Sequence, residues 1–295
     1  MPDPLPYLWS FGLSAVAAGL VVLALAGPRR PAGLARLNMA CLLAMGLGLG
    51  AGAGILGWRW PPASGLDRFL TIVIPAALLA ELILGLPRVP RRLGRCLRAA
   101  LAMATPWVLL HGSVYLSAPA EGSPARLDAL ILAASGLLLA IVWGLTDRLW
   151  QRSGGVALPL ALGLTALCTG LMVMMAGYIR GGAMAFPIAA AIMAAAIVSM
   201  ITSPRLQAPS LAGLGVVGLF GLLFIGRFFG RLPPGSAIIL LLAPLLCWAT
   251  ELPFLRCAKR WQREALRLVL VAIPLAVLLI AAKRGFDRDM APLLP

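Results

Sequence analysis

The sequence predicts an all-α fold, a polytopic bundle of about ten transmembrane helices. Of the 295 residues, 61% are hydrophobic and 12% are charged, whereas about a quarter of a soluble domain is charged because its surface faces water. The apolar residues form runs of about 20, the length that a helix needs to cross the hydrocarbon core. These runs do not alternate as barrel strands do, and a helix satisfies its own backbone hydrogen bonds in lipid.

Ten segments are long and apolar enough to cross a bilayer. In chain order they are 7–27, 36–57, 68–86, 97–117, 127–146, 155–178, 184–202, 210–229, 236–255 and 265–282. The first resembles a secretory signal, because Ala24-Leu25-Ala26 has the form of a cleavage site. Residues 1–6 carry no Lys or Arg, however, and Arg29 and Arg30 follow the apolar run. This order of charges favours a retained first helix.

The net charge of +15 comes largely from basic residues in short loops between apolar segments. This placement is typical of a membrane protein, whose basic loops mark its orientation, and we expect no nucleic-acid partner. One side of the predicted membrane holds 16 of the 25 Lys and Arg residues, and the other side holds 9. The richer side comprises the loops 28–36, 87–98, 147–153, 203–208 and 256–267. We expect it to be cytoplasmic, which places both termini outside the cytoplasm of a bacterial inner membrane.

Glycines at helical spacing mark two of the predicted segments. The glycines that we expect at helix–helix contacts are Gly46, Gly50, Gly54 and Gly218, together with Gly48 and Gly52. Their G-x-x-x-G faces allow helix backbones to approach closely. We interpret them as packing seams, either within the chain or against a second copy or another membrane subunit. The run Gly213 to Gly218 matches a dinucleotide fingerprint, but that motif requires a preceding strand, so no cofactor is expected.

Two parts of the chain share an ordered set of short matches. The run Arg59-Trp60-Pro61-Pro62-Ala63-Ser64 matches Arg231-Leu232-Pro233-Pro234-Gly235-Ser236. Each run leads to an acid–leucine pair and then to an Arg-Cys pair, namely Glu81-Leu82 and Arg95-Cys96, and Glu251-Leu252 and Arg256-Cys257. We predict a parallel repeat of helices 2–4 and 8–10, 36–117 and 205–282, with 127–178 as spacer in a single domain, 1–295. Coincidence between two low-complexity stretches is the alternative.

Glu81 and Glu251 are the main candidates for a polar or ion-binding site. Each lies about four or five residues from the cytoplasmic end of its predicted helix, where a carboxylate is costly unless it is paired, protonated or hydrated. In one interpretation, the two acids flank a cavity between the repeat copies and exchange protons or hold a cation. In the other, each pairs with an arginine such as Arg88, Arg91 or Arg256 and anchors its helix.

His111 is the only histidine in the chain. Its spacing of four from Trp107 and from Tyr115 predicts that the three side chains share one helix face. It is a candidate for a proton-sensitive group or a polar ligand contact. A hydrogen bond between helices that stabilises packing is the alternative.

Basic residues before two of the segments are expected to face anionic headgroups, which makes membrane lipids the expected partners. These residues are Arg91, Arg92, Lys259 and Arg260. Catalytic residues and a metal site are not expected, because the five cysteines form no C-x-x-C and no nucleophile–base set is evident.

The leading functional hypothesis is a transporter or permease for a small solute or ion. It is based on the helix count, the repeat, the two acids and the prolines inside apolar segments, which are Pro75, Pro106, Pro159, Pro187, Pro244 and Pro274. The first alternative is a non-catalytic membrane subunit or scaffold that packs through its glycine faces. The second is an enzyme that modifies a lipid or isoprenoid, for which His111 and Glu251 would be the polar groups.

Overall fold

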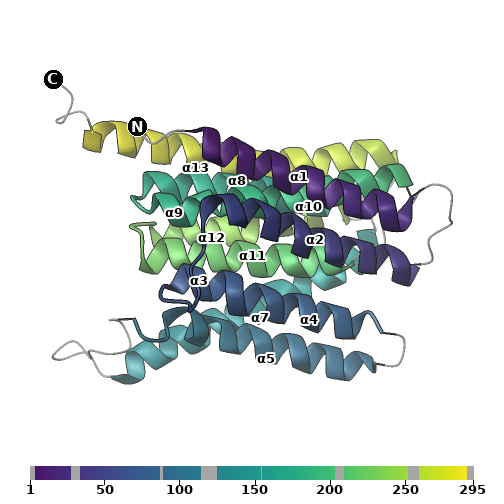
Figure 1. Ribbon diagram of the computed structural model, residues 1–295. Helices are drawn as coiled ribbons and strands as arrows, with labels where there is room; N and C mark the ends of the chain where they lie inside the picture. Colours follow the sequence, from purple (N-terminus) through teal and green to yellow (C-terminus); the bar gives the residue numbers. More distant parts are fainter. Residues whose placement is uncertain are drawn as a thin grey trace.

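The computed structural model describes residues 4–27, 34–86, 89–113, 125–153, 155–202, 209–251 and 259–290. Helices make up the regular structure of these residues, and no strand occurs among them. The helices lie side by side with their long axes in roughly one direction (Figure 1). The prediction of a helical membrane bundle is confirmed.

The helices follow one another with short connections. In order they are α1 (Leu5–Ala26), α2 (Leu34–Leu56), α3 (Gly65–Arg68), η1 (Phe69–Val73), α4 (Ile74–Leu84), α5 (Arg91–Leu110), α7 (Ala125–Ser153), α8 (Ala157–Met175), α9 (Ile179–Ala183), α10 (Ala185–Thr202), α11 (Pro209–Phe228), α12 (Pro234–Leu242), η2 (Ala243–Glu251) and α13 (Arg260–Met290). Nine stretches of the described chain are long and apolar enough to cross a membrane.

The predicted segment 68–86 is a tenth stretch, formed by α3, η1 and α4 without a break. The helical stretch 65–84 stands apart from the nine because it carries three charged residues, Asp67, Arg68 and Glu81. In Figure 1 it runs alongside α5, and the chain traverses the bundle in alternating directions. As a result, α1 begins and α13 ends at the same end of the bundle, as an even number of crossings requires.

Two helices are longer than the sequence predicted, and one is shorter. α7 ends at Ser153 instead of residue 146, and α13 ends at Met290 instead of residue 282. In both cases charged residues continue the helix, since helical backbone bonds are internal and do not require apolar side chains. α5 ends at Leu110 instead of residue 117, because Gly112 adopts a φ of +64° and stops the helix.

Two helices depart from α geometry beside a proline. η1 is a π-helical turn just before Pro75, which has no N–H to donate to the preceding turn. η2 is a 3₁₀ segment that begins at Ala243, next to Pro244. The two irregular segments therefore lie in the stretches, 68–86 and 236–255, that correspond in the predicted repeat.

α11 is the most buried helix of the bundle. Every residue from Ser210 to Gly226 is buried, and the helix packs against α4, α7, α8 and α12. The Phe69 ring of η1 lies where a side chain at position 221 would stand, so Gly221 permits this contact. An apolar helix thus occupies the interior of the bundle.

Candidate functional site

Glu81 forms a buried ion pair with an arginine of the next helix. The acid lies near the end of α4, and 2% of its side chain is exposed. Arg98 of α5 donates from Nε to Glu81 Oε1 at 2.8 Å and from Nη2 to Oε2 at 2.9 Å. Nη1 of Arg98 lies 3.1 Å from Oδ1 of Asp147 on α7. Paired hydrogen bonds of this kind are strong and directional, so Arg98 connects α4, α5 and α7.

A glycine of α11 makes room for this cluster. A Cβ at Gly213 would lie 2.6 Å from Glu81 Oε1 and 3.0 Å from Trp143 Nε1, so a larger residue would displace both groups. The Arg98 guanidinium lies 5.7 Å from the centroid of the Trp143 ring, within the range of a cation–π contact. The buried Nε1 of Trp143 has no hydrogen-bond partner among the described residues. The cluster therefore joins α11 to the three helices that Arg98 connects.

Glu251 belongs to a second cluster, in which one arginine again contacts two acids. Arg267 of α13, which is 3% exposed, donates from Nη2 to Glu251 Oε1 at 2.5 Å. Its Nη1 lies 2.9 Å from Oε1 of Glu264, and its Nε donates to Thr250 Oγ1 at 2.7 Å. One guanidinium thus holds two carboxylates and a hydroxyl, and it attaches η2 to α13.

Glu264 also connects this cluster to the start of α8. Its Oε2 accepts a hydrogen bond from the backbone N–H of Ala157 at 2.9 Å. The first N–H groups of a helix have no partner within the helix, and a carboxylate there is favoured by the helix dipole. Arg152 at the end of α7 lies 5.2 Å from the centroid of the Trp248 ring on η2. The second cluster therefore holds α7, α8, η2 and α13 together.

The two clusters extend the match between the predicted repeat copies. Each acid lies near the end of a stretch that a non-α segment interrupts, and each pairs with an arginine of the next membrane helix, 17 residues on for Glu81 and 16 for Glu251. In each copy the guanidinium also holds a second acid. This spacing of acid and arginine is the signal in the sequence by which Arg98 and Arg267 could be recognised.

The described partners of the two acids are arginines that the sequence did not suggest. The structure pairs Glu81 with Arg98 and Glu251 with Arg267, whereas the sequence analysis named Arg88, Arg91 and Arg256. Arg88, Arg256 and the side chain of Arg91 lie outside the described residues. The observed partners lie within the following helix, where a long side chain can reach back to the acid.

Glu81 and Glu251 do not meet across a shared polar space. α11 packs against both α4 and α12, the helices that lead to the two acids. Its buried side chains are apolar apart from Ser210. Because both acids are also neutralised locally, the structure brings each to its own arginine and not to the other acid.

His111 lies at the end of α5, next to a cavity. Its backbone carbonyl accepts a hydrogen bond from Nη1 of Arg68, and its side chain is exposed. It lines a space of about 490 Å³ together with Arg68 and Trp107. Tyr115, the third residue of the predicted face, lies outside the described residues.

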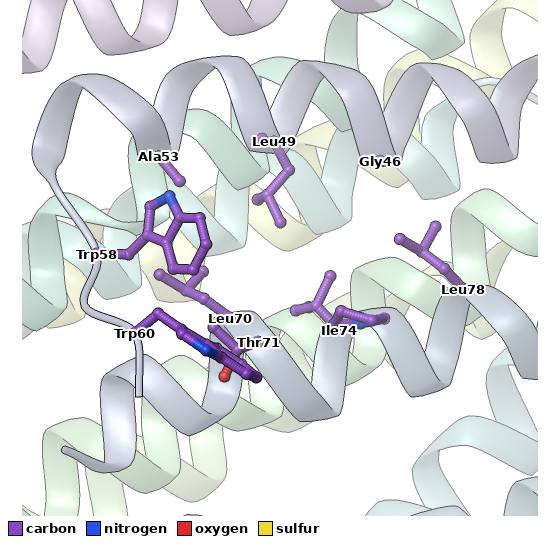
Figure 2. A pocket seen from close by; sticks show the side chains of 11 residues that line it. Gly46, Leu49, Ala53, Trp58, Trp60, Leu70, Thr71, Ile74 and Leu78 are labelled. Carbon is purple, nitrogen blue, oxygen red and sulfur yellow. The ribbon is translucent and has the colours of Figure 1, made fainter. Parts of the chain in front are cut away.

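A second hollow opens between α2 and the stretch of η1 and α4. It has a volume of about 390 Å³, and Figure 2 shows it bounded by Leu49 and Ala53 on one side and by Leu70 and Ile74 on the other. Trp58 and Trp60 lie at one end of this groove (Figure 2). Its lining is almost wholly apolar.

The predicted glycine faces of α2 have different surroundings. A Cβ at Gly48 or Gly52 would lie 2.9 or 2.8 Å from a backbone carbonyl oxygen of α1, so this face is a seam within the chain. Gly46 and Gly50 line the groove, and a Cβ at Gly50 or Gly54 would meet no atom within 4 Å.

Gly218 of α11 faces α10. A Cβ there would lie 3.2 Å from Ile188 Cγ2, so this glycine also belongs to a seam inside the chain.

Two of the residues expected at lipid headgroups are exposed, Arg92 and Lys259. The side chains of Arg91 and Arg260 lie outside the described residues. A comparison with protein-family models finds no match to this chain, and a comparison with curated proteins finds no significant similarity.

Proposed function

We propose that this protein is a non-catalytic subunit of a membrane assembly, in which it packs against a transmembrane helix of a partner. The observation that supports this proposal most directly is the buried apolar helix α11, which fills the centre of the bundle and packs against α4, α7, α8 and α12. The acids that a transport pathway would use are held in separate ion pairs. The bundle therefore resembles a packed scaffold more than a carrier with a central site.

The groove between α2 and α4 is the proposed contact for the partner helix. Gly46 and Gly50, one turn apart, form its smooth wall, and Gly54 extends this open face along α2. A G-x-x-x-G face lets a second backbone approach closely, whereas an acyl chain requires no such face. The other glycine face of α2, at Gly48 and Gly52, already performs this role within the chain.

The mass of the assembly in a mild detergent tests this proposal. We expect a complex larger than the 30.8 kDa chain, and we expect Gly50→Leu to dissociate it because the new side chain fills the groove. Gly144→Leu on α7 is the matched control, since Gly144 also has open space around it but lies outside the groove. A stable monomer from native membranes, or equal effects of the two variants, would contradict the proposal.

Transport of a small solute or ion is the second candidate. It is favoured by the irregular segments η1 and η2, which interrupt the two corresponding stretches 68–86 and 236–255, as discontinuous helices do in many transporters. Transport would require α11 and η2 to move and to admit water. Cys247 on η2 is 1% exposed, so labelling of this thiol by a membrane-impermeant maleimide would favour transport. Exposed Cys96 is the positive control, and protection of Cys247 under all conditions would favour the subunit.

An enzyme that acts on lipid or isoprenoid has less support. His111 and Glu251 lie in different sites, and the cavity beside His111 is lined by Arg68 and Trp107 with no acid or nucleophile among its described lining residues. Full function of a His111→Ala variant in cells would remove this candidate.

We further propose that the protein resides in a bacterial inner membrane with both termini outside the cytoplasm. The support is the excess of Lys and Arg in the loops at one end of the bundle, which is typical of the cytoplasmic side.

A further inference from the structure

The cavity beside His111 has a polar end and an apolar end. It lies between η1 and the last turn of α5, and its volume is about 490 Å³. Arg68 and His111 form the polar part of its lining, and Ile72 and Val108 lie one turn further into the bundle on the two helices. Trp107, which is 44% exposed, and Pro62 complete the wall. A space with this division fits an amphiphile better than a small polar solute.

Arg68 brings a positive charge to this cavity without an acidic partner in the described part of the chain. The neighbouring acid, Asp67, is directed elsewhere. Asp67 Oδ1 accepts a hydrogen bond from the Arg59 backbone at 3.2 Å, and its Oδ2 accepts one from the Ser64 hydroxyl at 2.7 Å. It also lies 3.6 Å from Nη2 of Arg180. The charge of Asp67 is therefore engaged by residues that do not line the cavity.

The position of the Arg68 guanidinium is set by the protein itself. Its Nη1 donates to the backbone carbonyl of His111, which ties the end of α3 to the end of α5. One hydrogen bond to a neutral carbonyl leaves other N–H groups of the fork for an anion. Arg68 thus combines a fixed orientation with an uncompensated charge.

We propose that this cavity binds the headgroup of an anionic phospholipid. The phosphate accepts hydrogen bonds from Arg68, and the glycerol and the start of the acyl chains lie along Ile72 and Val108. The positive charge of Arg68 favours an anion. The apolar half of the cavity favours a hydrocarbon chain attached to that anion, and free phosphate has no such chain. Trp107 and the nearby Trp60 are exposed, as aromatic residues at the headgroup level of a bilayer are.

Lipid titration with detection by native mass spectrometry tests the proposal. Delipidated protein in detergent is titrated with phosphatidylglycerol and, separately, with phosphatidylcholine. We expect one tightly held phosphatidylglycerol, weaker binding of phosphatidylcholine, and a loss of affinity of about tenfold or more in Arg68→Gln, because a hydrogen bond to a charged group is removed. Arg68→Lys, which keeps the charge but loses the fork, should retain an intermediate affinity.

Arg227→Gln is the matched control. Arg227 is exposed on the last turn of α11 and does not line the cavity. Phe229, two residues further on, packs against Gly65 of α3, which places Arg227 at the same end of the bundle as Arg68. Arg227 therefore carries the same charge as Arg68 outside the cavity. We expect it to bind phosphatidylglycerol as the natural chain does. Equal losses in Arg227→Gln and Arg68→Gln would overturn the site in favour of diffuse charge attraction.

A second variant tests whether the hydrocarbon part of the lipid contributes to binding. It also keeps the proposal testable if Arg68→Gln fails to fold. Val108→Trp leaves Arg68 in place and fills the apolar half, so it should weaken phosphatidylglycerol binding several-fold. Inorganic phosphate at millimolar concentration should not displace the lipid. Full displacement by phosphate, or unchanged lipid binding in both Arg68→Gln and Val108→Trp, would overturn the proposal. These outcomes do not depend on the assembly mass that tests the subunit proposal.

Discussion

A carboxylate inside a bilayer requires a partner, and the protein supplies one of the same type to Glu81 and to Glu251. Arginine suits this role because it stays charged and offers several N–H groups in a plane. When one member of a buried pair is lost, the other remains as an uncompensated charge. Each acid and its arginine are therefore expected to depend on one another for stability.

Arg98→Gln should destabilise the protein by about 3–5 kcal/mol, because Glu81 would remain buried beside a neutral amide. Thermal unfolding in detergent would report this as a lower midpoint. The double variant Glu81→Gln with Arg98→Gln should recover much of the loss, since neither charge is then present. Arg92→Gln on the same helix is the control, because Arg92 is exposed. Equal midpoints for Arg98→Gln and Arg92→Gln would show that the pair does not stabilise the fold.

Glu264 offers a test at the second cluster, because it acts on two partners. Its Oε2 accepts the N–H of Ala157 at 2.9 Å, and its Oε1 lies 2.9 Å from Nη1 of Arg267. Glu264→Ala should cost about 1–2 kcal/mol through the lost helix cap and should speed hydrogen exchange at the first turn of α8. Glu264→Gln, which keeps an acceptor for the N–H, should protect that turn better than alanine does. The role as a cap would be refuted by identical exchange in the two variants.

At the scale of the element, α2 packs against α1 with one of its glycine faces and borders the groove with the other. Ser10 and Ser14 of α1 lie against one of its glycine faces, and the Ser10 hydroxyl donates to the carbonyl of Gly52 at 2.8 Å. The other face borders the groove. The difference arises because residues two apart on a helix lie on different sides.

Alanine substitution at the two faces should give opposite results. A Cβ at Gly52 would lie 2.6 Å from Pro187 Cβ and 2.8 Å from the carbonyl oxygen of Ser10, so Gly52→Ala should destabilise the protein by about 1–3 kcal/mol through overpacking. Gly50→Ala adds a methyl group to open space and should leave the unfolding midpoint unchanged or slightly higher. Comparable losses in the two variants would mean that both faces are packed.

At the scale of the whole molecule, the bundle is organised around α11. This helix is buried on all sides, while α1 and α13 lie at the outside and present most of their apolar residues to lipid. The ion-pair clusters connect the surrounding helices near the ends of α4 and η2. An apolar centre with polar contacts near one end is stable in a bilayer, because unpaired polar groups are costly in hydrocarbon.

Reporter fusions at the two termini test the topology of the molecule. A reporter that is active only outside the cytoplasm should be active at either terminus, because ten crossings return the chain to its starting side and the basic loops favour the cytoplasm. A fusion within the loop 203–208, which holds Arg205, is the control and should be inactive. Opposite activities at the two termini would contradict an even number of crossings.

Much of the fold followed from the sequence because lipid acts on each segment separately. A run of about 20 apolar residues predicts a crossing helix whatever its neighbours are, and ten helices are present in the described chain. A proline inside an apolar segment favours an interrupted helix. η1 and η2 lie beside Pro75 and Pro244, whereas α5 and α13 continue through Pro106 and Pro274. The acids at 81 and 251 could be recognised as groups in need of a partner, since their depth is a local property.

Tertiary packing determined which helices contact one another and which side chains meet. Among the described residues, Arg98 and Arg267 meet the acids, because a guanidinium pairs with whichever carboxylate the helix contacts bring within reach. The same packing buried α11 in the centre of the bundle and left one glycine face of α2 open. Hydropathy and spacing describe how a residue relates to its own helix, whereas these outcomes depend on contacts between residues far apart in the chain.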